Sequence, residues 1–195
     1  MAAGKVCTGF SLPYVAKYSN TGNAVTYSNG MKLARGVNVS IDPESSDDNN
    51  FYADNVLAES ADSTFTSATL TLTVDGLLPA AEEMVMGVAA PSGADGWIAY
   101  GDAQTVPYVG VGFIARYMSD GVTTFTPYVL AKCMFNQLPT NAETQEESIN
   151  WQTQELTARV MRGDDAKHNW KYVGSSYETE AAAEAALKTK LGIQS

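Results

Sequence analysis

The sequence predicts a mostly β protein, an antiparallel β-sandwich or partly open barrel of about seven or eight strands with a short flanking helix and a C-terminal helix. Three observations support this prediction. Apolar and polar residues alternate with the period of a strand in several separate stretches. An Asp-Gly pair separates two long stretches of this kind, and only two short segments have helical spacing. A chain of 195 residues, 45% of them hydrophobic, suits a single domain with its own core.

Within this single domain, residues 1–31 are predicted to be an extended arm lying on a neighbour or, equally, a surface loop, because Gly, Ser, Asn and Tyr dominate the stretch SNTGNAVTYSNG. The sandwich is expected over residues 36–175, beginning with an alternating strand at Gly36–Ile41 that Pro43 closes. The acidic run ESSDDNN follows. It lacks the spacing of a calcium-binding loop, so we expect a solvated loop.

The clearest strand signal lies at Thr64–Asp75, where Leu and Val residues alternate with Ser and Thr residues. A strand of this kind is buried on one face and wet on the other. A short helix is expected near residues 79–87, with Pro79 at its start, acidic residues in its first turn and Gly87 at its end. Its side chains predicted to face the core are Met84, Val85 and Val88.

A long hairpin is predicted from Tyr108–Tyr117 and Thr123–Phe135, with Asp120-Gly121 as its turn. Gly110 and Gly112 share one face of it, which indicates close backbone approach or a bend. Pro127 predicts a bulge or a free edge.

The stretch Gln145–Val160 alternates in two phases, which predicts a strand with a β-bulge between Thr153 and Leu156. A polar loop at Gln137–Glu147 precedes it. We expect a short strand at Trp170–Val173 and a C-terminal helix within residues 178–191. In that helix Ala183, Leu187 and Leu191 form the apolar stripe and Gly192 is the stop.

Composition excludes several classes of function. The formal charge of −10 disfavours a protein that grips nucleic acid, which needs basic residues against phosphates. No apolar run approaches the roughly 20 residues of a membrane span, and we expect no signal peptide. Cys7 and Cys133 make no metal spacing, and Cys133 is expected to be a buried free thiol. We expect synthesis and folding in a reducing cytoplasm.

We find no catalytic constellation, and we expect neither an enzyme nor a cofactor. His168 is the only histidine, and we expect it in a solvated loop, because hydrolytic triads and histidine metal sites need a partnered histidine. Asp164 and Asp165 are adjacent, so their side chains have no defined acid–base geometry. Phosphate-binding, dinucleotide-binding, CxxC, HExxH and GxSxG motifs are absent from the sequence.

The order of these segments nevertheless resembles the major tail protein (tail tube protein) family of long-tailed, non-contractile phages of Gram-positive bacteria. The resemblance covers nearly the whole chain in one order. The matching pieces are PYVAKY, LARGVNVSIDPESSDDNNFYADNVLAES, FTSATLTLTVDGLLP, PYVGVGFIARYMSDGVTTFTPYVLAKCMF, ESINWQTQELTARVM and YETEAAAEAALKTKLG.

This resemblance implies a structural virion protein, made in the host bacterial cytoplasm, that assembles into stacked hexameric rings around the path of the ejected DNA. It implies a β-sandwich with a flanking helix, and a long hairpin or loop that reaches the next ring. The implied partners are other copies of the chain, with a tape measure protein and tail terminator or distal tail proteins. DNA would pass without specific binding, and no membrane is involved.

Two sets of residues take roles under this hypothesis. Polar strand faces free of lysine and arginine would line the lumen of a ring whose formal charge is 6 × −10 = −60, unless the acidity lies outside for solubility. The lumen-facing candidates are Thr69, Thr71, Thr73, Asn150, Gln152 and Gln154. The candidates for loops between subunits are Tyr14, Tyr18, Asp47, Asp48, Glu143 and Glu146.

A second class of function stays open, a monomeric β-sandwich that serves as a binding module for virion decoration, adhesion or carbohydrate. It would need a concave patch of exposed aromatic side chains, for which Tyr14, Tyr18 and Tyr27 are the candidates.

Overall fold

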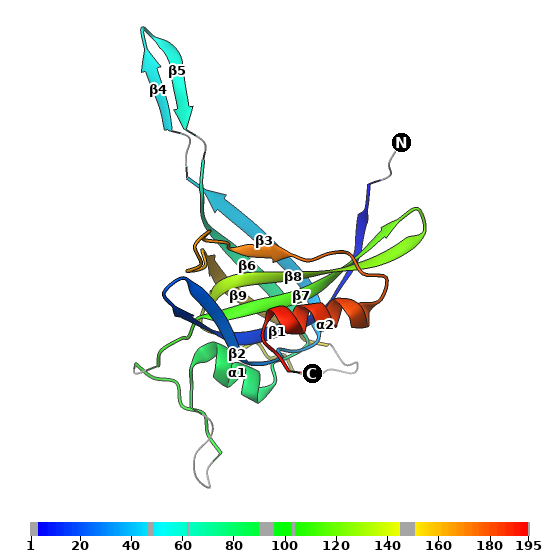
Figure 1. Ribbon diagram of the computed structural model, residues 1–195. Helices are drawn as coiled ribbons and strands as arrows, with labels where there is room; N and C mark the ends of the chain where they lie inside the picture. The colour runs from blue at the N-terminus through cyan, green and yellow to red at the C-terminus, as the bar shows by residue number, and fades with distance from the viewer. Residues whose placement is uncertain are drawn as a thin grey trace.

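A computed structural model describes residues 4–46, 49–61, 63–89, 96–102, 104–144 and 151–194. This part of the chain is mostly β, with an antiparallel eight-stranded sheet, a separate two-stranded hairpin and two helices (Figure 1). The predicted mostly β, antiparallel architecture is therefore confirmed. The predicted hairpin turn is confirmed as well, since Asp120 and Gly121 both have positive φ values, 48° and 78°.

The strands of the main sheet follow the order β2-β1-β7-β8-β9-β6-β3, and β10 pairs with β8 beside β9. The bounds are β1 (Val6–Thr21), β2 (Ala24–Lys32), β3 (Gly36–Ser45), β6 (Phe65–Val74), β7 (Val109–Ser119), β8 (Val122–Phe135), β9 (Gln154–Met161) and β10 (Lys171–Val173). Helix α1 spans Pro79–Met86 and helix α2 spans Glu180–Lys190.

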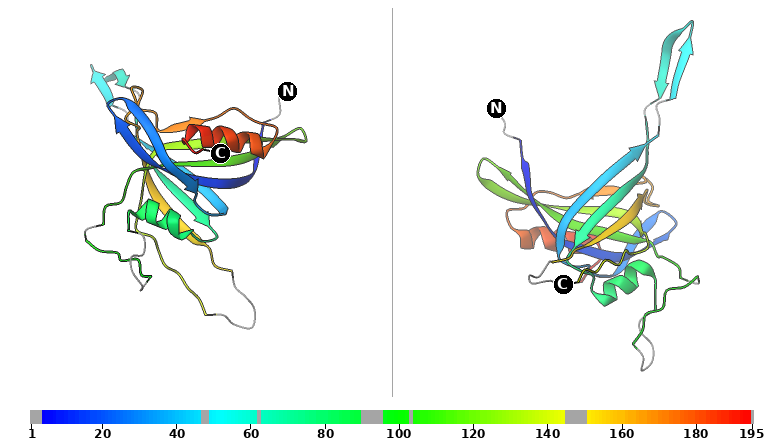
Figure 2. Two further views of the ribbon diagram at one scale, coloured as in Figure 1. Left: turned by 60° about the horizontal axis from the view of Figure 1, so that its bottom comes forward. Right: turned by 180° about the vertical axis from the view of Figure 1, so that it is seen from behind.

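The sheet curls around its main core, and α1 packs at the open end of the curl (Figures 1 and 2). The alternating residues predicted for β6 are buried as expected, and the register pairs three of them directly with the buried Leu156, Ala158 and Val160 of β9. In α1 the predicted Val85 is fully buried, while Met84 and Val88 are half-buried against the same core. Gly87 ends this helix in the left-handed region, as predicted.

Helix α2 covers the opposite, outer face of the sheet, over β7 and β8. Its stripe of Ala183, Leu187 and Leu191 is buried, as predicted. The two glycines of β7 make the close approach possible. A Cβ atom at Gly112 would lie 2.6 Å from Leu187 Cδ1, and one at Gly110 would lie 2.4 Å from Tyr27 Cε1. The prediction of close backbone approach is confirmed.

The prediction of an arm or loop over residues 1–31 is wrong. Strands β1 and β2 pair over most of this stretch, and β1 also pairs with β7. Three consecutive residues, Tyr14, Val15 and Ala16, are buried, because α2 covers one face of β1 and the main core covers the other. A strand buried on both faces does not alternate. Leu12, at a φ of 53°, lies within an irregularity of the β1/β7 register, which further hides the strand pattern.

Both prolines lie within strands. Pro43 does not close β3, which continues to Ser45, because β3 is an edge strand that has only β6 to bond with. Pro127 makes no bulge in the β7/β8 pairing, where it lies opposite Ile114. It precedes the part of β8 that pairs with β10, where its carbonyl oxygen accepts a hydrogen bond from the Gly174 N–H and its missing N–H group interrupts no bond of that short ladder.

The predicted bulge between Thr153 and Leu156 is also absent. Strand β9 begins at Gln154 and pairs with β6 in a regular register from Gln154 to Val160. The change of phase in the sequence marks the start of the strand, because Trp151 to Thr153 form no strand and are exposed. Residues 145–150 of the same stretch lie outside the described residues.

A second, two-stranded sheet formed by β4 (Asn49–Ala53) and β5 (Val56–Ala61) projects from the far ends of β3 and β6 (Figures 1 and 2). Asp54 and Asn55 make its turn, with φ values of 50° and 61°. The sequence predicts a solvated loop for the run ESSDDNN. Only its middle, Asp47 and Asp48, lies outside the described residues, and its two ends belong to strands β3 and β4.

The packing of α2 can be tested by Gly112→Val. The added side chain would meet Leu187 and Leu191, so we expect a loss of about 1–3 kcal/mol in the free energy of unfolding, as overpacked cores show. Urea unfolding measures it. Gly101→Val is the control, because a Cβ atom there meets nothing within 4 Å. Equal stability of the two variants would contradict the packing described for α2.

Candidate assembly surfaces

The outer face of β3, β6 and β9 is polar, and neither of the two described helices covers it. Register pairs place Thr69, Thr71 and Thr73 of β6 on this face, flanked by residues of β9 and β3. We call it the bare face. Its members are Asn38, Ser40, Asp42, Thr69, Thr71, Thr73, Glu155, Thr157 and Arg159.

Only some of the lumen-facing candidates lie on the bare face. The three threonines share it, as the sequence indicated, although Thr71 and Thr73 are half-buried. Gln154 points to the opposite, apolar face, because it shares the phase of Leu156 and pairs with Val74. Gln152 precedes β9 and donates a hydrogen bond from Nε2 to Glu143 Oε2 at 2.8 Å. Asn150 lies outside the described residues.

The charge of the bare face also differs from the prediction. Arg159 lies on it, opposite Thr69, so the face is not free of basic side chains. With Asp42 and Glu155 it carries two carboxylates and one guanidinium. The other six of its nine members carry a hydroxyl or an amide. Such a surface is nearly neutral, and it offers single, separated charges to a passing phosphate rather than a cluster.

The main sheet is open, because its two terminal strands, β2 and β3, each have a strand on one side only. Both edges carry irregularities. In β3 the register shifts at Val37, which is 56% exposed, and in β2 it shifts at Asn29, where φ is 53°. Bulges of this kind are a common protection of sheet edges. They leave short regular stretches where another strand can pair.

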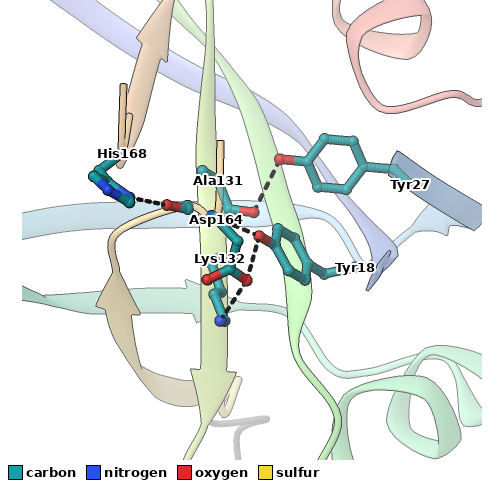
Figure 3. A network of polar contacts seen from close by, with 7 residues as sticks. Tyr18, Tyr27, Ala131, Lys132, Asp164 and His168 are labelled. Carbon is teal, nitrogen blue, oxygen red and sulfur yellow. Dashed lines mark hydrogen bonds and ion pairs between the residues drawn. The ribbon is translucent and has the colours of Figure 1, made fainter. Parts of the chain in front are cut away.

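A polar cluster locks the loop between β9 and β10 onto the sheet (Figure 3). The Tyr18 hydroxyl donates to Asp164 Oδ2 at 2.9 Å and accepts from the Asp164 backbone N–H at 2.9 Å. Lys132 Nζ lies 2.8 Å from the same carboxylate oxygen. The Tyr27 hydroxyl donates to the carbonyl oxygen of Ala131 at 2.9 Å. All these polar groups are bonded within the chain.

The electrostatics of the cluster follow from these contacts. The Lys132 ammonium lowers the pKa of Asp164, and the Tyr18 hydroxyl acts in the same direction. Burial, together with the neighbouring carboxylate of Asp164, raises the pKa of Tyr18 to about 12. Near neutral pH the carboxylate is therefore ionised and the phenol is neutral. The ion pair and the tyrosine hydrogen bond therefore both act on one oxygen of Asp164, and together they tie the loop to β1 and β8.

The adjacent Asp165 makes a separate set of hydrogen bonds within its own loop and to β10. Asp165 accepts hydrogen bonds from the Asn169 N–H, the Asn169 side chain and the Tyr172 hydroxyl, at 2.7–2.8 Å. Burial would raise the pKa of Asp165, but these bonds lower it on balance. His168 is exposed in the same loop, and its Nδ1 lies 3.2 Å from the Gly163 carbonyl oxygen.

A third group of contacts fastens α2 to β1. The Tyr14 hydroxyl donates to Glu184 Oε1 at 2.5 Å, and Lys188 Nζ lies 2.7 Å from the same oxygen. The Lys188 ammonium, followed by the Tyr14 hydroxyl, lowers the pKa of Glu184. Ser11 donates to Glu180 at the start of the helix.

The aromatic residues that we assigned to intersubunit loops or to a binding patch are therefore structural. Tyr14 and Tyr18 lie in β1 and are buried, which excludes both roles for them in the folded subunit. Tyr27 is half-buried beneath α2. Of the other loop candidates, Glu143 is exposed, and Asp47, Asp48 and Glu146 lie outside the described residues. The exposed tryptophans are Trp97 and Trp151, at 81% and 84% exposure, and the sequence alone did not single them out.

The structure also bears on metal binding, membrane insertion, thiol chemistry and ligand cavities. No group of three or more potential metal-binding side chains occurs among the described residues. Within the same residues no helix is long and apolar enough to cross a membrane. Cys133 is a fully buried free thiol, as predicted, and burial raises its pKa. A polar cavity of about 250 Å³ lies between the loop before β9 and the end of β6, and its lining includes Asp75, Asn141 and Gln152.

Comparisons with known proteins give no family for this chain. Neither the family models nor the curated proteins include a match to its sequence. The fold and surfaces thus define a class only: a mostly β protein with an open, curled sheet, one bare outer face and a projecting hairpin.

The polar cluster makes a prediction about pH. Asp164→Asn should lower the free energy of unfolding at neutral pH by about 1–2 kcal/mol, because Lys132 then lacks its carboxylate partner. The folded-state pKa of Asp164 lies below its usual value, so its stabilisation is present above about pH 4 and is lost as the pH falls further.

The difference between the two proteins should therefore shrink below about pH 4. Urea unfolding between pH 2.5 and 7 measures it, and the exposed Asp102→Asn is the control. If the difference in free energy of unfolding between the two proteins grew towards low pH, it would contradict this ion pair, because protonation of Asp164 must weaken the pair.

Proposed function

We propose that this protein is a structural subunit that assembles with copies of itself into rings and stacked rings, as a tail tube protein does. The observation that carries the proposal is the open sheet. Among the described residues both terminal strands have a free edge, and the outer face of β3, β6 and β9 has no cover. A free sheet edge pairs readily with another chain, and a closed ring is one way to satisfy it.

Three further features support this function. The resemblance of the sequence extends over nearly the whole chain in one order. The β4–β5 hairpin projects away from the body of the subunit, where it can reach a neighbouring copy (Figure 1). An isolated two-stranded hairpin is at best marginally stable in water, so a neighbour would stabilise it.

The bare face gives the proposal a mechanism. In a ring whose sheets lie side by side, that face would line the lumen, where threonine hydroxyls and separated charges contact water. Strong binding of DNA requires several cations that displace counterions from phosphates. A face with one guanidinium and two carboxylates does not provide them, so DNA would pass without being held.

A second function has one specific observation in its favour. Trp151 is 84% exposed and lies next in the chain to Gln152 and Thr153, which line the polar cavity with Asp75 and Asn141. An exposed indole beside amide and carboxylate groups is a common way to bind a sugar ring. A monomeric protein whose tryptophan fluorescence saturates with a saccharide would favour this binding module.

Sedimentation velocity over a range of concentrations, followed by negative-stain microscopy of the fastest species, tests the proposed function. We expect rings or short tubes that form as the concentration rises. A monomer at every concentration, with no tubes in lysates that contain the protein, would contradict self-assembly.

The role of the free edge can be tested with Val37→Lys. Val37 lies at the bulge of the edge strand β3 and is 56% exposed, so a lysine there should leave the fold intact. Because a charge on an edge strand opposes pairing with another sheet, the concentration for half-assembly should rise about tenfold, equivalent to about 1.4 kcal/mol. Val122→Lys, at an exposed hairpin turn, is the control with the same change of charge. Equal assembly of both variants would exclude pairing at this end of the β3 edge.

A further inference from the structure

We propose that the outer edge of β10 binds an extended peptide segment of a partner protein, in which acidic and apolar side chains alternate. The inference does not rest on the proposed self-assembly, and it concerns a part of the sheet that the assembly proposal leaves unused. It follows from three features: a free strand edge, two cations beside one face of that edge and an apolar groove beside the other face.

The free edge lies on the side of β10 that points away from β8. The Trp170 carbonyl oxygen and the Gly174 N–H group each form a 2.8 Å backbone hydrogen bond with β8. Because the backbone groups of an antiparallel strand alternate between its two sides, the N–H and C=O groups of Lys171 and Val173 point away from β8. No strand pairs with that side within the described chain. These groups are therefore available to an added strand.

The position of β6 leaves this edge open. Strand β6 begins at Phe65, whose ring stacks on the Trp170 ring with 4.4 Å between the centroids. The preceding strand, β5, belongs to the hairpin that projects away from the body of the subunit (Figure 1). In contrast to the terminal strands β2 and β3, β10 pairs with its neighbour without a register shift. An edge without a bulge keeps the geometry that an added strand needs.

One face of the edge carries positive charge. Lys171 points to the core side of the sheet, because its register partner Leu130 belongs to the main core. Its Nζ lies 4.6 Å from the centre of the Trp170 ring, and Arg162 donates a hydrogen bond to the carbonyl oxygen of Phe65. Both basic side chains are exposed, and no carboxylate pairs with either among the described residues. One aromatic stack thus positions two cations near the edge.

The carboxylates of the loop before β10 do not neutralise this face. Asp164 pairs with Lys132, and Asp165 accepts a hydrogen bond from the Tyr172 hydroxyl on the α2 side of the strand. Adjacent residues of a strand point to opposite faces, so Lys171 lies on the other side of β10 from this bond.

The other face of the edge borders an apolar groove beneath α2. The groove has a volume of about 370 Å³, and the buried Val129 and Leu187 contribute to its lining. Val173, which is 54% exposed, and Ser175 bring the edge segment itself into this lining. A strand added to β10 would direct every second side chain towards the groove, where apolar side chains fit.

An alternating acidic and apolar segment matches both faces. Its carboxylates would face Lys171 and Arg162, while the apolar residues between them cover the groove. A lysine on a strand edge opposes pairing with a neutral strand, so the carboxylates also provide specificity. The edge presents only the three residues Lys171–Val173, far less than the roughly 800 Å² per partner of a stable subunit interface. A single extended segment fits this size, whereas the sheet of a second copy does not.

Synthetic peptides test the inference on the full chain. The probe is fluorescein-labelled Ser-Glu-Val-Glu-Val-Glu-Ser, which alternates identically in both strand directions. Its controls are Ser-Glu-Glu-Glu-Val-Val-Ser, with the same composition, and Ser-Lys-Val-Lys-Val-Lys-Ser, with the opposite charge. Fluorescence anisotropy should show at least about tenfold tighter binding of the probe than of either control. Equal binding of the three peptides, or equal binding of a thymidine oligonucleotide of the same length, would overturn the proposal.

Two pairs of variants locate the bound peptide. Val173→Pro removes an N–H group that points away from β8, so it should weaken binding about tenfold and leave the ladder with β8 intact. Val173→Ala keeps this N–H group and should bind within about twofold of the wild type. Lys171→Glu should also weaken binding about tenfold, while Lys167→Glu, at another exposed lysine, should not. Wild-type affinity in both Val173→Pro and Lys171→Glu would contradict the site.

Hydrogen exchange gives a direct readout on the wild-type protein. A saturating concentration of the probe peptide should slow amide exchange at Lys171 and Val173 at least about tenfold. The Tyr172 amide, which faces β8, is the internal control and should not change. Unchanged exchange at Lys171 and Val173 would rule out an added strand.

Sedimentation of Val173→Pro separates a partner segment from a second copy. We expect this variant to self-assemble at the same concentration as the wild type, because the proposed subunit contacts lie elsewhere on the sheet. A higher concentration for half-assembly would assign the β10 edge to contact between copies, and the partner segment would then be wrong.

Discussion

One constraint shapes most of this structure: a single curled sheet has a helix over only half of its outer face. Strands β1, β7 and β8 are buried on both faces, against the main core and against α2. Strands β3, β6 and β9 are buried on one face only. The covered half requires glycines at positions 110 and 112 so that the helix can approach. The uncovered half can carry hydroxyls and charges at no cost to the core.

Two polar clusters hold the covered half in place. Glu184 joins α2 to β1 through Tyr14 and Lys188, while Asp164 joins the loop after β9 to β1 and β8 through Tyr18 and Lys132. In both, a tyrosine of β1 donates to a carboxylate that a lysine also binds. This repeated arrangement fastens β1, in a stretch that the sequence predicts to be an arm or loop, inside the sheet between β2 and β7.

The sequence predicts well the strands that are buried on one face only. It predicts poorly β1, which is buried on both faces. Strand β6 alternates cleanly because only one of its faces is buried, and the hairpin of β7 and β8 is marked by Asp120-Gly121. Strand β1 does not alternate, because two different partners bury its two faces. The bare face could be predicted only in part. Its threonines follow from the alternation, but Arg159 joins them through the pairing of β6 with β9, which places it opposite Thr69 and which the sequence does not specify.

The central claim is that assembly encloses the bare face, and the accessibility of Thr69 tests it most directly. Thr69 is exposed on this face in the subunit. Thr69→Cys in a Cys7→Ser background provides one reactive thiol, since Cys133 is buried. A bulky polymer-linked maleimide should label free subunits and react at least about tenfold more slowly with assembled tubes, while a small maleimide labels both. Equal reaction of the bulky reagent with subunits and tubes would show that the face points outward.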